Sequence, residues 1–197
     1  MAITVTLNDN ALITTTEADN FVWDTLDNHS DTEKDILYAV VNAISQAIED
    51  WLNRKIINAE ETEYHDGGDE VIMLDNFPIV SIDSVYEDGG ELTAETNHGE
   101  DNEDYDYYEG QGIIYSTSGR FENGRQIIKV TYTAGLGVTN SDIPDNIKLA
   151  CKIWVKQVME GDIENFGTII TEGTMIRPSN MPSLTRFFLQ AYKKRAV

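Results

Sequence analysis

A pair of glycines that follows a β-branched segment raises the question of a phosphate-binding loop. In "IIKVTYTAGLGVTNSDIPDN" (residues 127–146), Gly135 and Gly137 have the spacing of the first two glycines in the G-x-G-x-x-G loop of dinucleotide-binding proteins. Asn140 stands at the third position, and the next helix begins near Pro144, too late for its N-terminal N–H groups to face a phosphate. The pattern therefore favours a second interpretation, in which the glycines let the chain leave an edge strand and turn back.

The acidic run "ETNHGEDNEDYDYYEG" (residues 95–110) invites comparison with a calcium-binding loop. Such a loop needs carboxylates at alternating positions and a glycine at the sixth. Asp104 and Asp106 alternate, but Tyr108 interrupts the series. A solvated acidic loop is the favoured interpretation, and weak cation binding is the alternative.

The remaining chemically reactive side chains do not form a recognisable site. His29, His65 and His98 have no H-x-x-x-H spacing and no cysteine partner, although a zinc site needs at least three ligands. Cys151 is the only cysteine and lies in an apolar helical pattern, so it resembles a core residue of a protein made in a reducing cytoplasm. We therefore expect no catalytic residue, no cofactor and no metal, and we predict that the chain is not an enzyme.

Charge is distributed unevenly along the chain, whose net charge is −21. Residues 1–143 carry 30 acidic and 6 basic side chains, whereas residues 144–197 carry 5 acidic and 8 basic ones. An acidic body repels nucleic acid phosphates, which argues against general DNA binding. A basic tail on an acidic body suggests docking on an acidic partner, such as another copy of the same chain. We see no secretion signal and no membrane-spanning segment, so we expect no membrane partner.

Helical signals dominate the first third of the chain. Thr14 precedes Glu17, and Ser30 precedes Glu33, by the three residues of a capping box. An apolar stripe then predicts a helix over residues 31–53; it consists of Ile36, Leu37, Val40, Val41, Ile44, Ile48, Trp51 and Leu52. The opposite, polar face is predicted to hold Glu33, Asp35, Asn42, Gln46, Glu49 and Asn53.

The middle of the chain has strand chemistry. Residues 62–74 are predicted to form two short strands around a turn at Gly67-Gly68, and residues 77–90 a strand with Ile79, Ile82 and Val85 that is broken by Gly89-Gly90. The segments "DYYEGQGIIYS" and "RQIIKVTYTAG" are predicted to form a further pair, with Asn123-Gly124 as a hairpin-type turn between them. Residues 60–135 therefore indicate one small antiparallel sheet with acidic loops.

The last third returns to helix. An apolar stripe follows Pro144 and ends at Gly161; it consists of Ile147, Ala150, Cys151, Trp154, Val155, Val158 and Met159. Residues 161–181 read as an extended arm, and "SLTRFFLQAYKKRAV" reads as a short amphipathic helix. The predicted fold class is α+β, a helical bundle of the N- and C-terminal helices with an inserted small antiparallel β region. The predicted domains are residues 1–59 and 139–197, packed as one, and the insertion 60–138.

The arm and the last helix are the candidate interface with another subunit. Phe187 and Phe188 are adjacent and point about 100° apart, so either one packs inward while the other faces a partner, or both belong to a wide core-facing surface. The arm carries apolar residues with little regular structure to bury them, which is typical of segments covered by a neighbour. The full candidate set is Ile169, Ile170, Met175, Ile176, Arg177, Arg186, Phe187, Phe188, Tyr192, Lys193, Lys194 and Arg195.

Five short motifs occur in an order that resembles a known family. They are LIT at residues 12–14 with EA at 17–18, IEDWLNR at 48–54, PIVSIDSV at 78–85, VTYTAG at 130–135 and IP at 143–144. Their order and spacing resemble the head–tail connector (adaptor, or head-completion) proteins of tailed bacteriophages. The resemblance covers residues 12–160; the long acidic loop and the C-terminal arm fall outside its motifs.

The resemblance implies a structural virion protein located in the neck at the head–tail interface and assembled in the host cytoplasm. Its implied partners are other copies of itself in a ring of about a dozen, expected to be a dodecamer, the portal protein above, and a neck, stopper or tail protein below. Viral DNA would pass through the extended channel without specific binding. The alternative is a virion decoration or tail-associated binding module; an enzyme is the third possibility.

Overall fold

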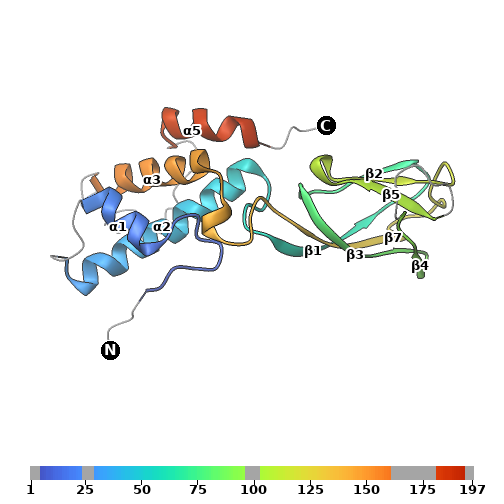
Figure 1. Cartoon of the computed structure of the whole chain (residues 1–197), viewed down its shortest axis with the longest axis horizontal. Helices are drawn as coiled ribbons and strands as arrows, with labels where there is room; N and C mark the ends of the chain where they lie inside the picture. Colours follow the sequence, from blue (N-terminus) through green and yellow to red (C-terminus); the bar gives the residue numbers. More distant parts are fainter. Residues whose placement is uncertain (1–4, 24–28, 96–102, 161–180, 194–197) are drawn as a thin grey trace. The chain divides into compact units, whose positions relative to one another are not determined.

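The computed structural model describes residues 5–23, 29–95, 103–160 and 181–193 and shows a mixed α+β fold (Figure 1). The chain divides into two compact units, one formed by the residues up to Ile56 and from Thr139 on, the other by Ile57–Val138. The first unit, hereafter the helical unit, contains α1 (Thr15–Trp23), α2 (Asp31–Leu52), α3 (Asp145–Glu160) and α5 (Ser183–Leu189). The second, hereafter the β unit, contains two antiparallel sheets.

Both predicted capping boxes are confirmed. At α2, the Glu33 N–H donates to Ser30 Oγ at 3.3 Å, and the Ser30 N–H donates to Glu33 Oε2 at 2.8 Å. The same reciprocal pair joins Thr14 and Glu17 ahead of α1, at 2.9 and 3.2 Å. These bonds satisfy N–H groups that have no partner within the helix, so local sequence fixes where each helix begins.

The predicted helix over residues 31–53 is confirmed as α2, but one residue of its polar face was assigned wrongly. Glu49 is only 3% exposed. The chain reverses at Asn53, whose φ of 54° is left-handed, and the Ile56 N–H then donates to Glu49 Oε1 at 3.0 Å. Asn10 Nδ2 donates to Glu49 Oε2 at 3.3 Å. The carboxylate therefore ties three segments of the helical unit together.

Replacing Glu49 with alanine is expected to lower the free energy of unfolding of the helical unit by about 3 kcal/mol, because it leaves the buried Ile56 N–H without its acceptor. Trp23, Trp51 and Trp154 all lie in this unit, so the tryptophan fluorescence of a urea titration reports on it. Asp50→Ala is the control: the Asp50 side chain is exposed and accepts a surface bond from Gln46 Nε2, so a change below about 0.5 kcal/mol is expected. Equal effects of the two variants would contradict the structural role of Glu49.

Helix α3 contributes the largest buried side chain of the helical unit. Ile147, Ala150, Cys151, Trp154 and Val155 are buried, as the predicted stripe requires, whereas Val158 and Met159 are half-buried. The predicted end of this helix at Gly161 and nearly all of the predicted arm lie outside the described residues; Met181, at the end of the arm, is buried.

Two lysines of α3 face α1. Lys152 Nζ lies 3.1 Å and Lys148 Nζ 3.9 Å from Glu17 Oε1. Burial by itself raises the pKa of Glu17, but the bond from the Thr14 N–H and the two ammonium groups outweigh it and leave the pKa below its ordinary value. The helices α1 and α3 are in contact, and these ion pairs therefore join a helix near the start of the sequence to one near its end.

Since the folded state holds the pKa of Glu17 below its unfolded value near 4.5, the carboxylate stabilises the fold above that pH and the contribution disappears as the pH falls through the folded pKa. Glu17→Gln is therefore expected to cost about 1 kcal/mol near neutral pH. The variant and the parent should converge in acid, once the pH lies below the folded pKa of Glu17. Urea titrations at neutral and at acidic pH check this, and a difference that persists in acid would contradict it.

Within its described residues, the β unit holds seven strands in two sheets. The four-stranded sheet has the order β1 (Ala59–His65), β7 (Ile128–Ala134), β3 (Ile79–Glu87), β4 (Gly90–Leu92). The three-stranded sheet has the order β2 (Val71–Met73), β6 (Ile113–Ser116), β5 (Tyr105–Tyr108). The prediction of one sheet over residues 60–135 was therefore wrong in number, although the antiparallel arrangement is confirmed.

The predicted strand pairs differ from those observed. The strands on either side of Gly67-Gly68 belong to different sheets, since β1 pairs with β7 and β2 with β6. "DYYEGQGIIYS" holds both β5 and β6, which pair with each other, while β7 joins β1 and β3. Asn123-Gly124 therefore does not connect paired strands. The turn at Gly89-Gly90 does connect a pair, β3 and β4.

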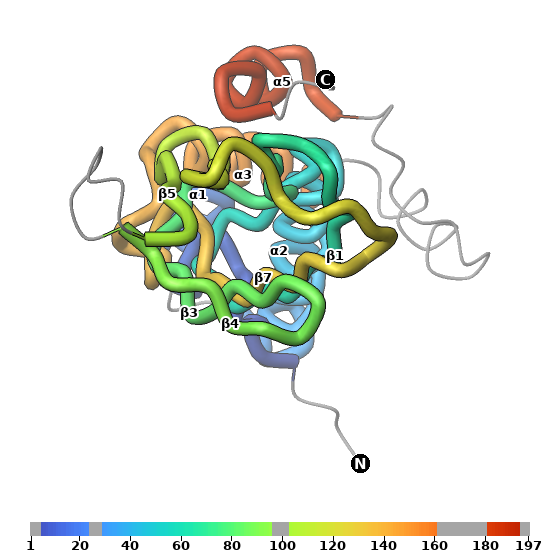
Figure 2. The backbone as a smooth tube through the Cα atoms, turned by 90° about the vertical axis from the view of Figure 1, so that its right-hand side faces the viewer, coloured from blue at the N-terminus to red at the C-terminus, as the bar shows by residue number. Residues whose placement is uncertain are grey.

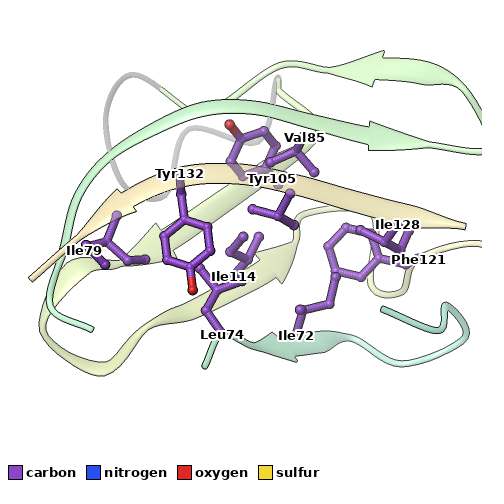
Figure 3. Close-up of a cluster of buried hydrophobic side chains, with 11 residues drawn as sticks. Ile72, Leu74, Ile79, Val85, Tyr105, Ile114, Phe121, Ile128 and Tyr132 are labelled. Carbon is purple, nitrogen blue, oxygen red and sulfur yellow. The ribbon is translucent and has the colours of Figure 1, made fainter. Parts of the chain in front are cut away.

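Side chains from both sheets meet in one apolar core (Figure 3). Ile72 and Ile114 come from the three-stranded sheet and Val85 and Tyr132 from the four-stranded sheet. The Tyr132 hydroxyl donates to a Glu63 carboxylate oxygen and accepts from the Asn76 N–H at 3.1 Å. Burial, and then the bond to Glu63, raises the pKa of Tyr132, so the phenol stays protonated and its polar tip is satisfied inside the unit.

The loop that follows β7, hereafter the glycine loop, contains Gly135 and Gly137 and packs closely against neighbouring backbone. Strand β7 is central in its sheet, so the expectation of an edge strand was wrong. The Gly135 N–H donates to the Pro78 carbonyl at 3.1 Å, and the Gly137 carbonyl accepts from the Asn58 N–H at 2.9 Å. Helix α3 begins only at Asp145, so this loop does not present a helix N-terminus to a phosphate.

Candidate interaction surface

Helix α5 runs alongside α3 and is held there by three residues at four-residue spacing (Figure 2). Met181, Thr185 and Leu189 are buried, and the Thr185 hydroxyl donates to the Ala150 carbonyl at 3.2 Å. A polar residue therefore occupies the middle of the packed face of α5.

The outward side of α5 is apolar. Leu184 is 50% and Phe187 70% exposed, and Phe188 is half-buried. The rings of Phe187 and Phe188 meet edge to face with centroids 5.7 Å apart. We call Leu184, Phe187 and Phe188 the helix patch. Apolar side chains therefore lie on the outward side of α5 as well as on the side that packs against α3, which indicates a surface meant for a partner.

The segment that follows α5 is anchored at the C-terminal end of α2. Arg54 Nη1 donates to the Tyr192 carbonyl at 3.3 Å, and Lys193 Nζ lies 4.4 Å from the centroid of the Trp51 ring. Burial lowers the pKa of the Arg54 guanidinium. Arg186 is exposed next to the helix patch. The helix patch thus lies near the basic side chains of Arg186 and Lys193, on a helix that is held in place by these contacts and by its packing on α3.

The structure describes only part of the candidate interface predicted from sequence. Arg186, Phe187 and Lys193 are exposed, and Phe188 and Tyr192 are partly buried. The other predicted residues, Ile169, Ile170, Met175, Ile176, Arg177, Lys194 and Arg195, lie outside the described residues.

A second exposed apolar surface lies on the outer side of the three-stranded sheet and was missed by the sequence analysis. Because Ile72, Ile114 and Tyr105 point into the core, their neighbours point outward. Met73 and Tyr108, which flank Ile113 in the strand register, are 53% and 51% exposed, and the Tyr108 and Tyr115 rings meet edge to face at 5.1 Å. We call the outward apolar residues Val71, Met73, Tyr108, Ile113 and Tyr115 the sheet patch. Alternation within "VIM" and "IIYS" was the available signal.

Cys151, His29 and His65, which the sequence analysis considered for chemistry, have structural roles. Cys151 is fully buried, and burial raises the pKa of its thiol to about 12, so it stays protonated. His65 Nε2 lies 3.0 Å from Glu63 Oε2, and the His29 ring stacks on Trp23; His98 lies outside the described residues. Within the described ranges, no group of three or more His, Cys, Asp or Glu side chains is arranged to hold a metal ion.

The model of the family described as "Head completion protein" matches residues 11–195. The chain belongs to the head completion protein family. None of the curated proteins matches this head completion protein at a significant level. Among its described residues, no helix combines the length and the apolar character that crossing a membrane requires.

Solved structures show the same fold. A chain of the "Virion of native gene transfer agent (GTA) particle" has a TM-score of 0.63 and 14% identity, covering 99% of this head completion protein and 96% of that chain. A chain of the "Neck of empty GTA particle computed with C6 symmetry" has a TM-score of 0.63 and 14% identity, with 100% and 97% covered. A chain of the "Neck of native GTA particle computed with C12 symmetry" has a TM-score of 0.53 and 13% identity, with 98% and 97% covered.

Proposed function

We propose that this head completion protein is a head–tail connector subunit that forms a ring beneath the portal in the virion neck. The ring extends the DNA channel and offers an attachment platform to neck or tail proteins. The helix patch is the observation that carries the proposal, because a seated helix with an exposed Leu184 and Phe187 needs a partner. Family membership and the neck particles that contain the similar chains support the same role.

In this proposal the helices of residues 1–59 and 139–197 form one bundle, and residues 60–138 are inserted between them in sequence. A ring of identical copies uses a heterologous contact, in which one surface meets a different surface of the next copy. We assign the candidate interface of the arm and α5 to this contact or to the portal. One of the similar neck structures was computed with C12 symmetry, which supports a ring of about a dozen copies here.

Charge supports passage of DNA without specific binding. Asp and Glu outnumber Lys and Arg by 35 to 14 in the whole chain, so carboxylates that line a channel would repel phosphates. We infer that the protein acts without catalysis, since its buried thiol, His29 and His65 serve packing and hydrogen bonding.

Electron microscopy of the full chain mixed with purified portal protein of the same virus tests this function. The proposal predicts a second ring stacked coaxially on the portal. A decoration module or an enzyme would leave the portal unaltered, and that result, under conditions in which the portal itself is intact, would overturn the connector role.

A further inference from the structure

The sheet patch lies among acidic side chains. Residues 57–138 carry 19 Asp and Glu against 3 Lys and Arg, and strands β2, β5 and β6 contain no basic residue. Asp106 pairs with Tyr115 in the strand register, and Glu70, Asp75 and Glu109 are exposed beside the strand ends. A partner of this surface therefore combines apolar side chains with positive charge.

The helix patch has this complementary chemistry. It presents Leu184 and Phe187, with Arg186 between them in sequence, and residues 183–197 hold four basic and no acidic side chains. Both surfaces belong to one chain, so each copy of a closed ring can use both of them: one toward each neighbour. Such an arrangement buries every exposed large apolar residue of the two patches without requiring a different protein.

We propose that α5 of one copy docks on the sheet patch of the next copy, with the helix patch against Met73, Ile113 and Tyr108. The proposal rests on the connector ring proposed as the function and adds the two surfaces that close it. Arg186 and Lys193 then approach the acidic rim, which fixes the direction of docking because two helix patches, or two sheet patches, repel each other.

Thiol cross-linking tests the contact, because the native Cys151 is fully buried with a pKa raised to about 12 and does not compete. Full-length Ser183→Cys, Gly110→Cys and the double variant are mixed with portal protein and treated with a bismaleimide whose flexible spacer does not need disulfide geometry. Both positions are exposed, Ser183 directly before Leu184 and Gly110 two residues after Tyr108, so both patches keep their apolar side chains. The double variant should give a ladder of covalent multimers. An equal mixture of the two single variants should give dimers, and each single variant alone should remain monomeric.

The double variant Ser183→Cys/Val80→Cys is the matched control, since Val80 is 52% exposed but belongs to the other sheet. It should stay monomeric. A ladder from the control equal to that from Ser183→Cys/Gly110→Cys, dimers of Ser183→Cys alone, or a link only within one chain would each overturn the docking. Rings seen by microscopy without the predicted ladder would overturn this contact and leave the connector function standing, whereas absence of rings as well would remove both.

Discussion

Replacing Leu184 and Phe187 together with serine is expected to abolish ring assembly while the free energy of unfolding of the helical unit changes by less than about 0.5 kcal/mol. The two side chains are exposed, so the isolated fold loses little when they are shortened. In an interface, each buried apolar anchor contributes about 2 kcal/mol or more. Loss of two anchors weakens each contact by about a thousandfold.

Light scattering coupled to size-exclusion chromatography, with portal protein present, measures this effect as a loss of the assembled mass. Val138→Ser is the control, because Val138 is also 70% exposed and lies outside both patches; its variant should assemble like the parent. Full assembly of the Leu184→Ser/Phe187→Ser variant would show that the helix patch is not an interface.

Gly135→Ala is expected to lower the free energy of unfolding of the β unit by about 3 kcal/mol. A methyl group at this position would lie 2.7 Å from both the Cα and the backbone N of Asn58. Backbone atoms cannot rotate away as a side chain can, so β7 and the segment before β1 would have to separate. Without a methyl group, Gly135 allows this close approach.

Hydrogen–deuterium exchange of peptides from residues 57–138, measured by mass spectrometry at increasing urea, follows the β unit separately from the helical unit. The urea midpoint of this signal should fall for Gly135→Ala. Gly110→Ala is the control, since no atom lies within 4 Å of the position of its added methyl group. An unchanged midpoint for Gly135→Ala would contradict the packing role of the glycine loop.

Features that depend on neighbours in sequence were predictable. The capping boxes and most of the buried stripe of α2 follow from three- and four-residue spacing and are confirmed. Two members of the predicted stripe differ, since Ile36 is exposed and Trp51 is half-buried. The role of Glu49 was not predictable from spacing, because it depends on the reversal at Asn53 that returns the Ile56 N–H to the helix. Helical periodicity alone therefore predicted that Glu49 lies on the polar face, although its carboxylate is buried.

Strand existence was easier to predict than strand pairing. Each strand has β-branched or aromatic residues between turn signals, but β1 pairs with β7, whose residues lie more than sixty positions later in the chain. Assigning pairs between neighbours in sequence failed because the turn at Gly67-Gly68 leads from one sheet to the other. The presence of two layers depends on these long-range pairs.

The orientation of α5 was the part of the candidate site that sequence left open. Both faces of the helix are suitable for packing by composition, since Leu184 and Phe187 are as apolar as Met181 and Leu189. The hydrogen bond from the Thr185 hydroxyl to the Ala150 carbonyl favours the face that contains the threonine. This choice turns Phe187 outward and leaves Phe188 half-buried, so the two adjacent phenylalanines have different environments.

A cryo-electron microscopy map of the intact virion tests the central claim most directly. The account predicts density for this chain as a ring at the head–tail junction, between the portal and the next neck or tail component, with α5 of each copy in contact with a neighbouring subunit. Density for the chain on the capsid surface or at the tail tip, with another protein filling the junction, would contradict it.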